Sequence, residues 1–322
     1  MSDPRVLRHV LASITPASVV HGEAARRAVA GAGAAVLERL AVALGSAQHT
    51  PRPRSLRRTI VVCAGDHGVG DPGIALGAAH PTIVAAHAIA DGSAALAQVA
   101  RASRSPVVLV SAGVREPDEL PPTAVRIAGG PSRDLLAGPA MTLVDAALGL
   151  EAGIALAVAL ADDGLDVLAV GALGVGADVA SSALLGAALG APPTGLADPV
   201  AEAAGARGAQ LSGASGLELL ATFGGPETAL LAGVMLAAAS TNVPVVLDGY
   251  ATGAAALVAA ALAPLVTGYL IAAHAGAFTQ PRILAHLGLR PVFEVGLGHG
   301  EGTGAAMVLP LIDQVTALTS AG

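Results

Sequence analysis

The sequence of 322 residues contains no lysine and no tryptophan, one cysteine, three phenylalanines and two tyrosines. Without lysine, any bound phosphate must be held by arginine, backbone N–H groups or hydroxyls. The lone Cys63 excludes a disulfide within the chain and is typical of a reducing cytoplasm. With few aromatic side chains and a net charge of −7, the chain offers neither stacking platforms nor a basic groove, so we expect no nucleic-acid partner.

Charged residues make up only 13% of the chain and hydrophobic residues 53%, so a membrane location must be tested. Residues 253–273 form the longest uncharged candidate, but they are mostly alanine, contain Pro264 and lack flanking interfacial anchors. We predict a helix, a proline break and a buried strand there, and no membrane partner. The start, Met1 to Arg5, carries no apolar secretory segment. We therefore expect a cytoplasmic protein.

The chain begins with an alanine-rich helical pattern over residues 5–46, and a proline-containing linker follows over residues 49–58. Beyond the linker, short β-branched runs alternate with helical segments, which favours a doubly wound, mostly parallel α/β sheet of Rossmann-like type. The predicted strands are 59–64, 107–111, 125–128, 167–170, 243–247 and 267–273. We divide the chain into a helical segment and linker (1–58), an α/β catalytic domain (59–305), and a C-terminal helix (306–322) packing on the first helices.

Polar residues and glycines follow four of these strands. They are Gly65-Asp66-His67-Gly68, Gly171 to Gly176, Asp248-Gly249 and His274. Because the carboxyl ends of parallel strands meet at one edge of a sheet, we expect these four segments to share one ligand crevice.

Glu301 is the only carboxylate in the glycine-rich window from Gly298 to Gly304. Glycine lets a backbone lie directly against a ligand, and a lone carboxylate in such a setting suits a general base. The alternative is a turn whose glutamate opens the next helix, where its charge complements the helix dipole.

Three other motifs allow a functional or a structural interpretation. Asp66-His67 is either an acid–base pair or a cap with a hydrogen-bonded histidine, and the scattered histidines exclude a metal site. The glycines of 171–176 run G-x-x-G-x-G, which is the wrong register for a dinucleotide fingerprint, and Asp178 would repel an anion there. Glu227 either binds a ligand hydroxyl or complements the dipole of a helix that Pro226 opens.

Five motifs taken in order resemble the nicotinate-nucleotide–dimethylbenzimidazole phosphoribosyltransferase family, over residues from about 60 to 312. They are Ala64-Gly65-Asp66-His67-Gly68-Val69, Gly138-Pro139-Ala140-Met141-Thr142, Gly224-Gly225-Pro226-Glu227, Asp248-Gly249 and Gly300-Glu301-Gly302-Thr303-Gly304-Ala305. The resemblance implies small-molecule substrates, a homodimer, no cofactor and no metal. It implies Glu301 as the catalytic residue and a substrate-binding set of Asp66, His67, Gly174, Gly176, Gly225, Asp248, His274, His299, Gly300 and Gly302.

The family's reaction displaces nicotinate from C1′ of nicotinate mononucleotide by a benzimidazole nitrogen, giving α-ribazole 5′-phosphate for the lower ligand of cobalamin. The leaving pyridinium departs neutral, whereas the incoming base must lose a ring proton. The resemblance thus assigns Glu301 as the general base, and we expect the glycine-lined pocket to raise its pKa.

The departures from the family pattern fall at ligand-facing positions. Gly298 stands where the family has an arginine for the 5′-phosphate, Ala172 replaces an acidic residue, and Ala177-Asp178 replaces Asn-Thr. Losing phosphate-binding cations favours altered substrates, such as a nucleoside without phosphate or a different base. The alternative to an active transferase is a catalytically silent homologue that serves as a partner subunit or a ligand-binding protein.

Overall fold

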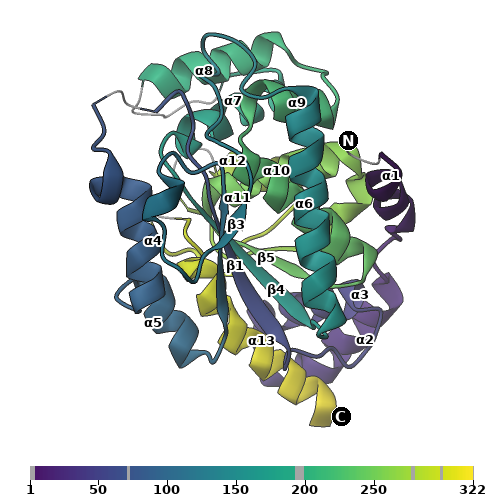
Figure 1. Cartoon of the computed structure of the whole chain (residues 1–322). Helices are drawn as coiled ribbons and strands as arrows, with labels where there is room; N and C mark the ends of the chain where they lie inside the picture. Colours follow the sequence, from purple (N-terminus) through teal and green to yellow (C-terminus); the bar gives the residue numbers. More distant parts are fainter. Residues whose placement is uncertain (1–3, 71–72, 193–198, 277–279, 298–299, 322) are drawn as a thin grey trace.

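The computed structural model describes residues 4–70, 73–192, 199–276, 280–297 and 300–321. Its centre is a single sheet of six parallel strands in the order β3-β2-β1-β4-β5-β6 (Figure 1). The strands are β1 Arg58–Ala64, β2 Val107–Ala112, β3 Val125–Ile127, β4 Val167–Leu173, β5 Val245–Leu247 and β6 Leu270–Ala272. In the register, Ile60 of β1 lies opposite Val107 of β2 and Ala169 of β4.

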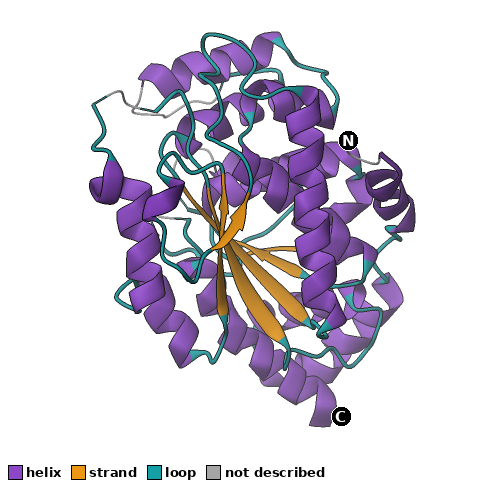
Figure 2. Ribbon diagram, in the orientation of Figure 1, coloured by secondary structure: helices purple, strands orange, loops and turns teal. Residues whose placement is uncertain are grey.

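Both faces of the sheet are covered by helices (Figure 2), so the central strands are apolar and buried except for Arg58 and Thr59 at the start of β1. Successive residues of β1 point to opposite faces, and they contribute to two separate cores. Val61 and Cys63 belong to one core, with helices α6, α7, α9, α10 and α11. Ile60 and Val62 belong to the other, with α2, α3, α4, α5 and α13.

The starting points of two long helices follow from the sequence. Helix α6 opens with a capping box between Thr142 and Asp145, and α10 opens with Pro226 at its first turn. The α-helices are α1 Pro4–Ser13, α2 Val19–Val29, α3 Ala35–Ala47, α4 Pro81–Asp91, α5 Ala95–Ala102, α6 Leu143–Asp162, α7 Ala177–Leu189, α8 Pro199–Gln210, α9 Gly216–Phe223, α10 Pro226–Ser240, α11 Gly249–Leu262, α12 Gln280–His286 and α13 Thr303–Ala321.

All six predicted strands are present, and the predicted fold class is confirmed. Two boundaries were wrong by three residues: Gly171, Ala172 and Leu173 belong to β4 and are buried, whereas the sequence placed them in the loop after it, and residues 267–269 end a 3-10 helix before β6. The glycine in this strand marks a place where another backbone approaches closely, as described below.

Three helical stretches are long and apolar enough to span a bilayer by length and composition, namely 81–102, 143–162 and 303–321. All three contribute side chains to the two cores that cover the sheet. The segment 253–273 is a helix, a break at Pro264 and a buried strand, as predicted.

The last helix, α13, shares a core with the N-terminal helices α2 and α3. Figure 1 shows it (yellow) running beneath the sheet toward the same end of the molecule as α2 and α3. It begins at Thr303 and crosses residue 305, the domain boundary predicted from the sequence, without interruption. The division into three segments therefore stays a prediction.

Candidate active site

The strand order places the switch point of the sheet between β1 and β4, which are neighbours although their following connections lead to opposite edges. Ligands of doubly wound proteins bind beyond the carboxyl ends of the strands at this point. Here the two strand ends are tied together, because Gly65 N–H donates to Leu173 O at 3.0 Å. A Cβ on Gly174 would lie 1.6 Å from the Gly65 carbonyl oxygen, so the contact requires glycine.

A cavity of about 220 Å³ opens at this edge of the sheet. It is lined by Pro81, Thr82, Ala85, Ala172, Leu173, Gly174, Val175, Ala177, Tyr250, Ala251, Gly300 and Glu301. Among these described residues, Glu301 carries the only formal charge at neutral pH. The chemistry of the cavity therefore centres on one carboxylate in an otherwise apolar and hydroxyl-bearing wall.

The backbone at Glu301 lies directly on β4. Ala172 N–H donates to Gly300 O at 3.0 Å, which extends the hydrogen bonding of the sheet to this loop. A Cβ on Gly171 would lie 2.4 Å from the carbonyl carbon of Glu301, and one on Gly249 would lie 2.5 Å from Gly300 Cα. The missing side chains at these two glycines are therefore what allows Glu301 to sit at the end of the sheet.

Asp248, fully buried at the end of β5, fixes the turn that follows Glu301. Its Oδ2 accepts hydrogen bonds from the backbone N–H groups of Gly302 (2.7 Å) and Gly304 (3.1 Å) at the start of α13. A carboxylate there also complements the positive end of the helix. His274, after β6, donates from Nε2 to Asp248 Oδ1 at 2.7 Å. This chain of contacts links two strand ends to the position of Glu301.

Asp66, also fully buried, ties together the loops after β1, β2 and β4. It accepts hydrogen bonds from the Thr82 hydroxyl, from Arg115 N–H (2.8 Å) and from Val175 N–H (3.0 Å). Asp66 therefore holds the wall of the cavity and does not face its interior.

His67 does not pair with Asp66 but with Glu227, at the start of α10. His67 Nε2 lies 3.0 Å from Glu227 Oε1, and both side chains are buried. Burial alone would lower the pKa of His67, but the adjacent Glu227 carboxylate outweighs it, and the pKa of His67 is raised. Burial likewise opposes ionisation of Glu227, yet His67 beside it leaves the pKa of Glu227 below its ordinary value. The two form a buried ion pair.

The His67–Glu227 ion pair explains why the residue just before α10, Gly225, is a glycine. A Cβ on Gly225 would lie 2.3 Å from Glu227 Oε2 and 2.6 Å from His67 Cε1. That Oε2 atom is buried and has no hydrogen-bond partner in the described part of the chain. Neither residue of the pair lines the 220 Å³ cavity, so the pair supports the strand ends behind it.

Tyr250 provides the one aromatic ring among the described lining residues of the cavity. Burial, with a smaller contribution from the Asp178 carboxylate, raises the pKa of its phenol well above the ordinary value. The phenol is therefore neutral at physiological pH. It offers an apolar ring face together with a hydroxyl that can donate a hydrogen bond.

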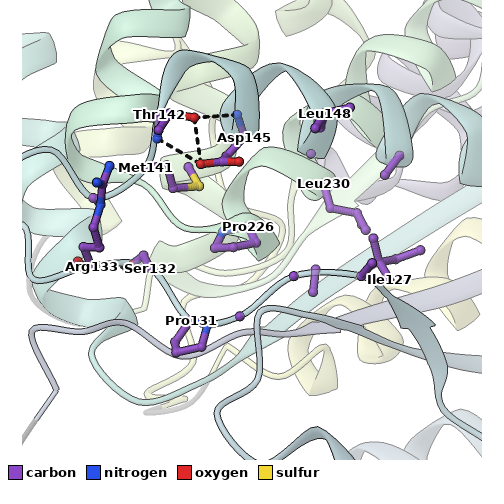
Figure 3. A pocket seen from close by; sticks show the side chains of 17 residues that line it. Ile127, Pro131, Ser132, Arg133, Met141, Thr142, Asp145, Leu148, Pro226 and Leu230 are labelled. Atoms are coloured by element: carbon purple, nitrogen blue, oxygen red, sulfur yellow. Dashed lines mark hydrogen bonds between the residues drawn. The ribbon is translucent and has the colours of Figure 1, made fainter. Parts of the chain in front are cut away.

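A second, larger cavity of about 580 Å³ lies beyond β2 and β3, beside the first turns of α6 and α10. Figure 3 shows its wall of Ile127, Met141, Leu148 and Leu230. Two of the polar side chains on its edge, Thr142 and Asp145, bond each other, as the dashed lines show, and Arg133 also lines the cavity. This cavity is larger than the one at the switch point, but Glu301 lines the smaller one.

The structure brings the four predicted strand-end segments to one edge of the sheet, at different depths. Glu301, Gly174 and Gly300 line the small cavity. The side chains of four other predicted binding residues are fully or almost fully buried behind it: Asp66, His67, Asp248 and His274. Gly176 and Gly302 take positive φ angles at the starts of α7 and α13, and Gly225 precedes α10. His299 lies outside the described residues.

Sequence reasoning missed Tyr250 and Thr82. Tyr250 is one of two tyrosines and directly follows Asp248-Gly249, so the strand-end argument extended by one residue would have found it. The sequence around Thr82 contains nothing that indicates a ligand site, apart from its position directly after Pro81. Among the described residues, no group of three or more histidine, cysteine or carboxylate side chains is arranged to hold a metal ion.

Comparison with known proteins agrees with this geometry. A family model described as phosphoribosyltransferase matches residues 23–321. The nicotinate-nucleotide–dimethylbenzimidazole phosphoribosyltransferase of Roseiflexus sp. (strain RS-1) is 38% identical over 296 residues, covering 85% of this chain and 82% of that protein. The protein of the same name from Desulforudis audaxviator is 35% identical, covering 88% and 84%.

The crystal structure of CobT from Thermus thermophilus superposes with a TM-score of 0.81 at 31% identity, covering 93% of this chain and 96% of that one. Fold, cavity and family match together define a phosphoribosyltransferase of the α/β class, and hence an enzyme that transfers a pentosyl group. Within that class, the chain belongs to the nicotinate-nucleotide–dimethylbenzimidazole phosphoribosyltransferase family.

Proposed function

We propose that this protein transfers the ribosyl group of a nicotinate nucleotide or nucleoside to a benzimidazole-type base, giving an α-ribazole for the cobalamin lower ligand. The names of the relatives support the substrate class. The observation that carries the proposal is the single carboxylate, Glu301, in the cavity at the switch point of the sheet. A lone base is what this chemistry needs, because only the incoming base must lose a proton.

In the proposed reaction, a benzimidazole nitrogen attacks C1′ with its lone pair while the bond from C1′ to the pyridinium nitrogen breaks. The bonding electrons return to the pyridine ring, which leaves without accepting a proton. The N–H proton of the attacking base passes to the Glu301 carboxylate. The Tyr250 ring supplies an aromatic face for one of the two flat rings.

Much of the rate enhancement would come from holding two small reactants together in one site. We assign this positioning to the buried groups behind the cavity. Asp248 and His274 hold the turn that carries Glu301, and Asp66 holds the loops that carry Thr82 and Val175. The His67–Glu227 pair keeps the end of β1 against the start of α10. These residues are positioning residues, and Glu301 is the catalytic residue.

Replacement of Glu301 by glutamine tests the proposal, since it keeps the shape of the side chain and removes the base. We expect kcat to fall by about 10²–10⁴-fold with nicotinate mononucleotide or its riboside and dimethylbenzimidazole, while calorimetry still detects substrate binding. Glu294→Gln is the matched control, because Glu294 is exposed in the preceding segment. Undiminished activity in Glu301→Gln would exclude Glu301 as the base. Binding without any turnover in the wild type would identify a catalytically silent homologue instead.

We also infer that the enzyme works as a cytoplasmic homodimer that binds neither nucleic acid nor membrane. The exposed face of α6 supports self-association, because Leu143, Val144 and Leu148 are 52%, 60% and 45% exposed. Apolar side chains gathered on a surface mark protein interfaces. Light scattering of the wild type and of Val144→Asp tests this: the wild type should have the mass of a dimer and the variant that of a monomer.

A further inference from the structure

A cavity of about 750 Å³ lies at the amino ends of β1 and β2, the edge of the sheet opposite the candidate active site. The linker before β1, the end of α5 and the second half of α13 form its wall. Figure 1 shows α13 (yellow) ending on this side of the molecule. Because β1 has seven residues, about 20 Å separates this cavity from the loop after β1. The cavity is therefore a separate site.

Arginine side chains make this cavity positive. Arg54, Arg58 and Arg104 line it, and Asp313 is the one carboxylate among its described lining residues, so two positive charges are in excess. By contrast, no arginine or histidine is among the described residues that line the cavity at Glu301, and the chain has no lysine. Of these two cavities, the one at the amino ends of the strands is therefore the better site for an anion.

Arg58 is built into the wall of this cavity. Its side chain is only 10% exposed, and it donates to Asp313 Oδ1 and, at 2.6 Å, to Ser103 O at the end of α5. Ser55 Oγ donates to the same Asp313 oxygen at 2.8 Å. The two contacts of Arg58 use two of the five N–H donors of its guanidinium. They hold a nearly buried positive charge at a fixed place in the cavity wall.

Arg104 has a backbone conformation that favours glycine. Its φ of 51° is left-handed, and helices commonly end with a glycine in this conformation, as α4 does at Gly92. Arg104 is exposed, and its guanidinium makes no hydrogen bond or ion pair with any other described residue. The Ser103 carbonyl already has Arg58 as its donor, so Arg104 is not needed to cap α5. An arginine at such a backbone position without a protein partner indicates a partner outside the chain.

The donors left for a ligand are guanidinium groups. Arg54 is 73% exposed, and 3.6 Å separates its Nε from Asp166, which is too long for a hydrogen bond. The hydroxyl groups of Ser55, Thr316 and Ser320 donate to protein acceptors. A ligand in this cavity would therefore be held by the arginines and not by the hydroxyls.

We propose that this cavity binds a phosphate group, either inorganic phosphate or the phosphate of a small ester, through Arg54, Arg58 and Arg104. The planar guanidinium donates two parallel hydrogen bonds to phosphate oxygens. A phosphate group carries about −1.5 to −2 charges at pH 7, close to the excess positive charge of the wall. Asp313 shares the wall and repels the anion, which gives one test its sign. The inference goes beyond the proposed transfer reaction and does not depend on it.

Isothermal titration calorimetry of the whole protein with inorganic phosphate, at low ionic strength to limit screening, tests this site. We expect Arg104→Gly to weaken binding about tenfold or more, because it removes charge-assisted hydrogen bonds. Glycine suits the positive φ, so urea denaturation should show no loss of stability. Asp313→Asn should tighten binding about threefold or more, because it removes the opposing charge and frees an N–H group of Arg58. Arg290→Gln is the matched control: Arg290 is exposed after α12 and does not line the cavity, so its loss should leave the affinity unchanged.

Three results would each overturn the inference: no phosphate binding, equal affinity in the wild type and Arg104→Gly, or unchanged or weakened affinity in Asp313→Asn. Phosphate bound at the candidate active site would not respond to Arg104→Gly, so the result is independent of whether the transfer reaction occurs. Titration with ribose 5-phosphate then distinguishes the two sources of the phosphate group. Tighter Arg104-dependent binding of this ester than of inorganic phosphate supports a small ester, and equal or weaker binding supports free phosphate.

Discussion

Asp248→Asn offers the sharpest test of how the structure holds Glu301, the carboxylate proposed as the catalytic base. One oxygen of Asp248 accepts two backbone N–H bonds from the start of α13, and the other accepts the N–H of His274. Asparagine keeps the size but has only one acceptor oxygen, so its NH₂ group must face either the helix start or His274. An NH₂ group facing the helix start meets donors there, and one facing His274 forces the imidazole proton onto Nδ1, which is buried without a partner among the described residues.

The cost follows from burial. A buried donor left without an acceptor costs about 1–3 kcal/mol, and Asp248 accepts three hydrogen bonds. We therefore expect Asp248→Asn to lower the free energy of unfolding by about 3 kcal/mol, measured by urea denaturation. Because the Glu301 turn is released, kcat should fall by about 10²-fold. KM for the donor should change little, since Asp248 does not line the cavity.

Asp313→Asn is the matched control on the same helix. Asp313 lies near the middle of α13, accepts hydrogen bonds from Arg58 and Ser55 and is 45% exposed, so its loss should cost less than that of Asp248 and leave kcat unchanged. A folded Asp248→Asn variant with wild-type stability and kcat would refute the reasoning. A loss of stability with unchanged kcat would show that the network supports the fold but does not position Glu301.

Three further predictions concern the groups around the cavity. The His67–Glu227 pair should stabilise the fold most between pH 4.5 and 6.5, which are the ordinary pKa values of the two groups. As the pH rises through the raised pKa of His67, the contribution of the pair to the free energy of unfolding declines. It also declines as the pH falls through the lowered pKa of Glu227. Urea unfolding against pH tests this, and His67→Gln/Glu227→Gln should flatten the profile. Gly171→Ala should cost about 1–3 kcal/mol and lower kcat, because its methyl group meets the Glu301 backbone, whereas Gly138→Ala, with open space around it, should do neither. Tyr250→Leu should raise KM for the aromatic base up to about tenfold while Tyr250→Phe does not, if the ring and not the hydroxyl binds the base; steady-state kinetics decide.

The strands could be predicted because a parallel sheet covered on both faces requires continuous apolar runs, and residues 59–64 and 167–170 show them plainly. The same reasoning predicts that the carboxyl ends of the strands meet at one edge of the sheet. The pairing of His67 with Glu227 could not be predicted, because 160 residues separate them and neither local sequence indicates its partner. The misplacement of Gly171 has a similar cause: the backbone that demands a glycine there belongs to Glu301, far along the chain.

The route of α13 has a consequence for how the protein folds during its synthesis. The helix carries the apolar face that completes the core over α2 and α3, and it starts two residues after Glu301. The first helices therefore emerge from the ribosome long before the helix that covers them, and their apolar faces stay exposed until α13 is made. Folding and activation thus become one late event, since the segment that closes the core also delivers Glu301 to its site.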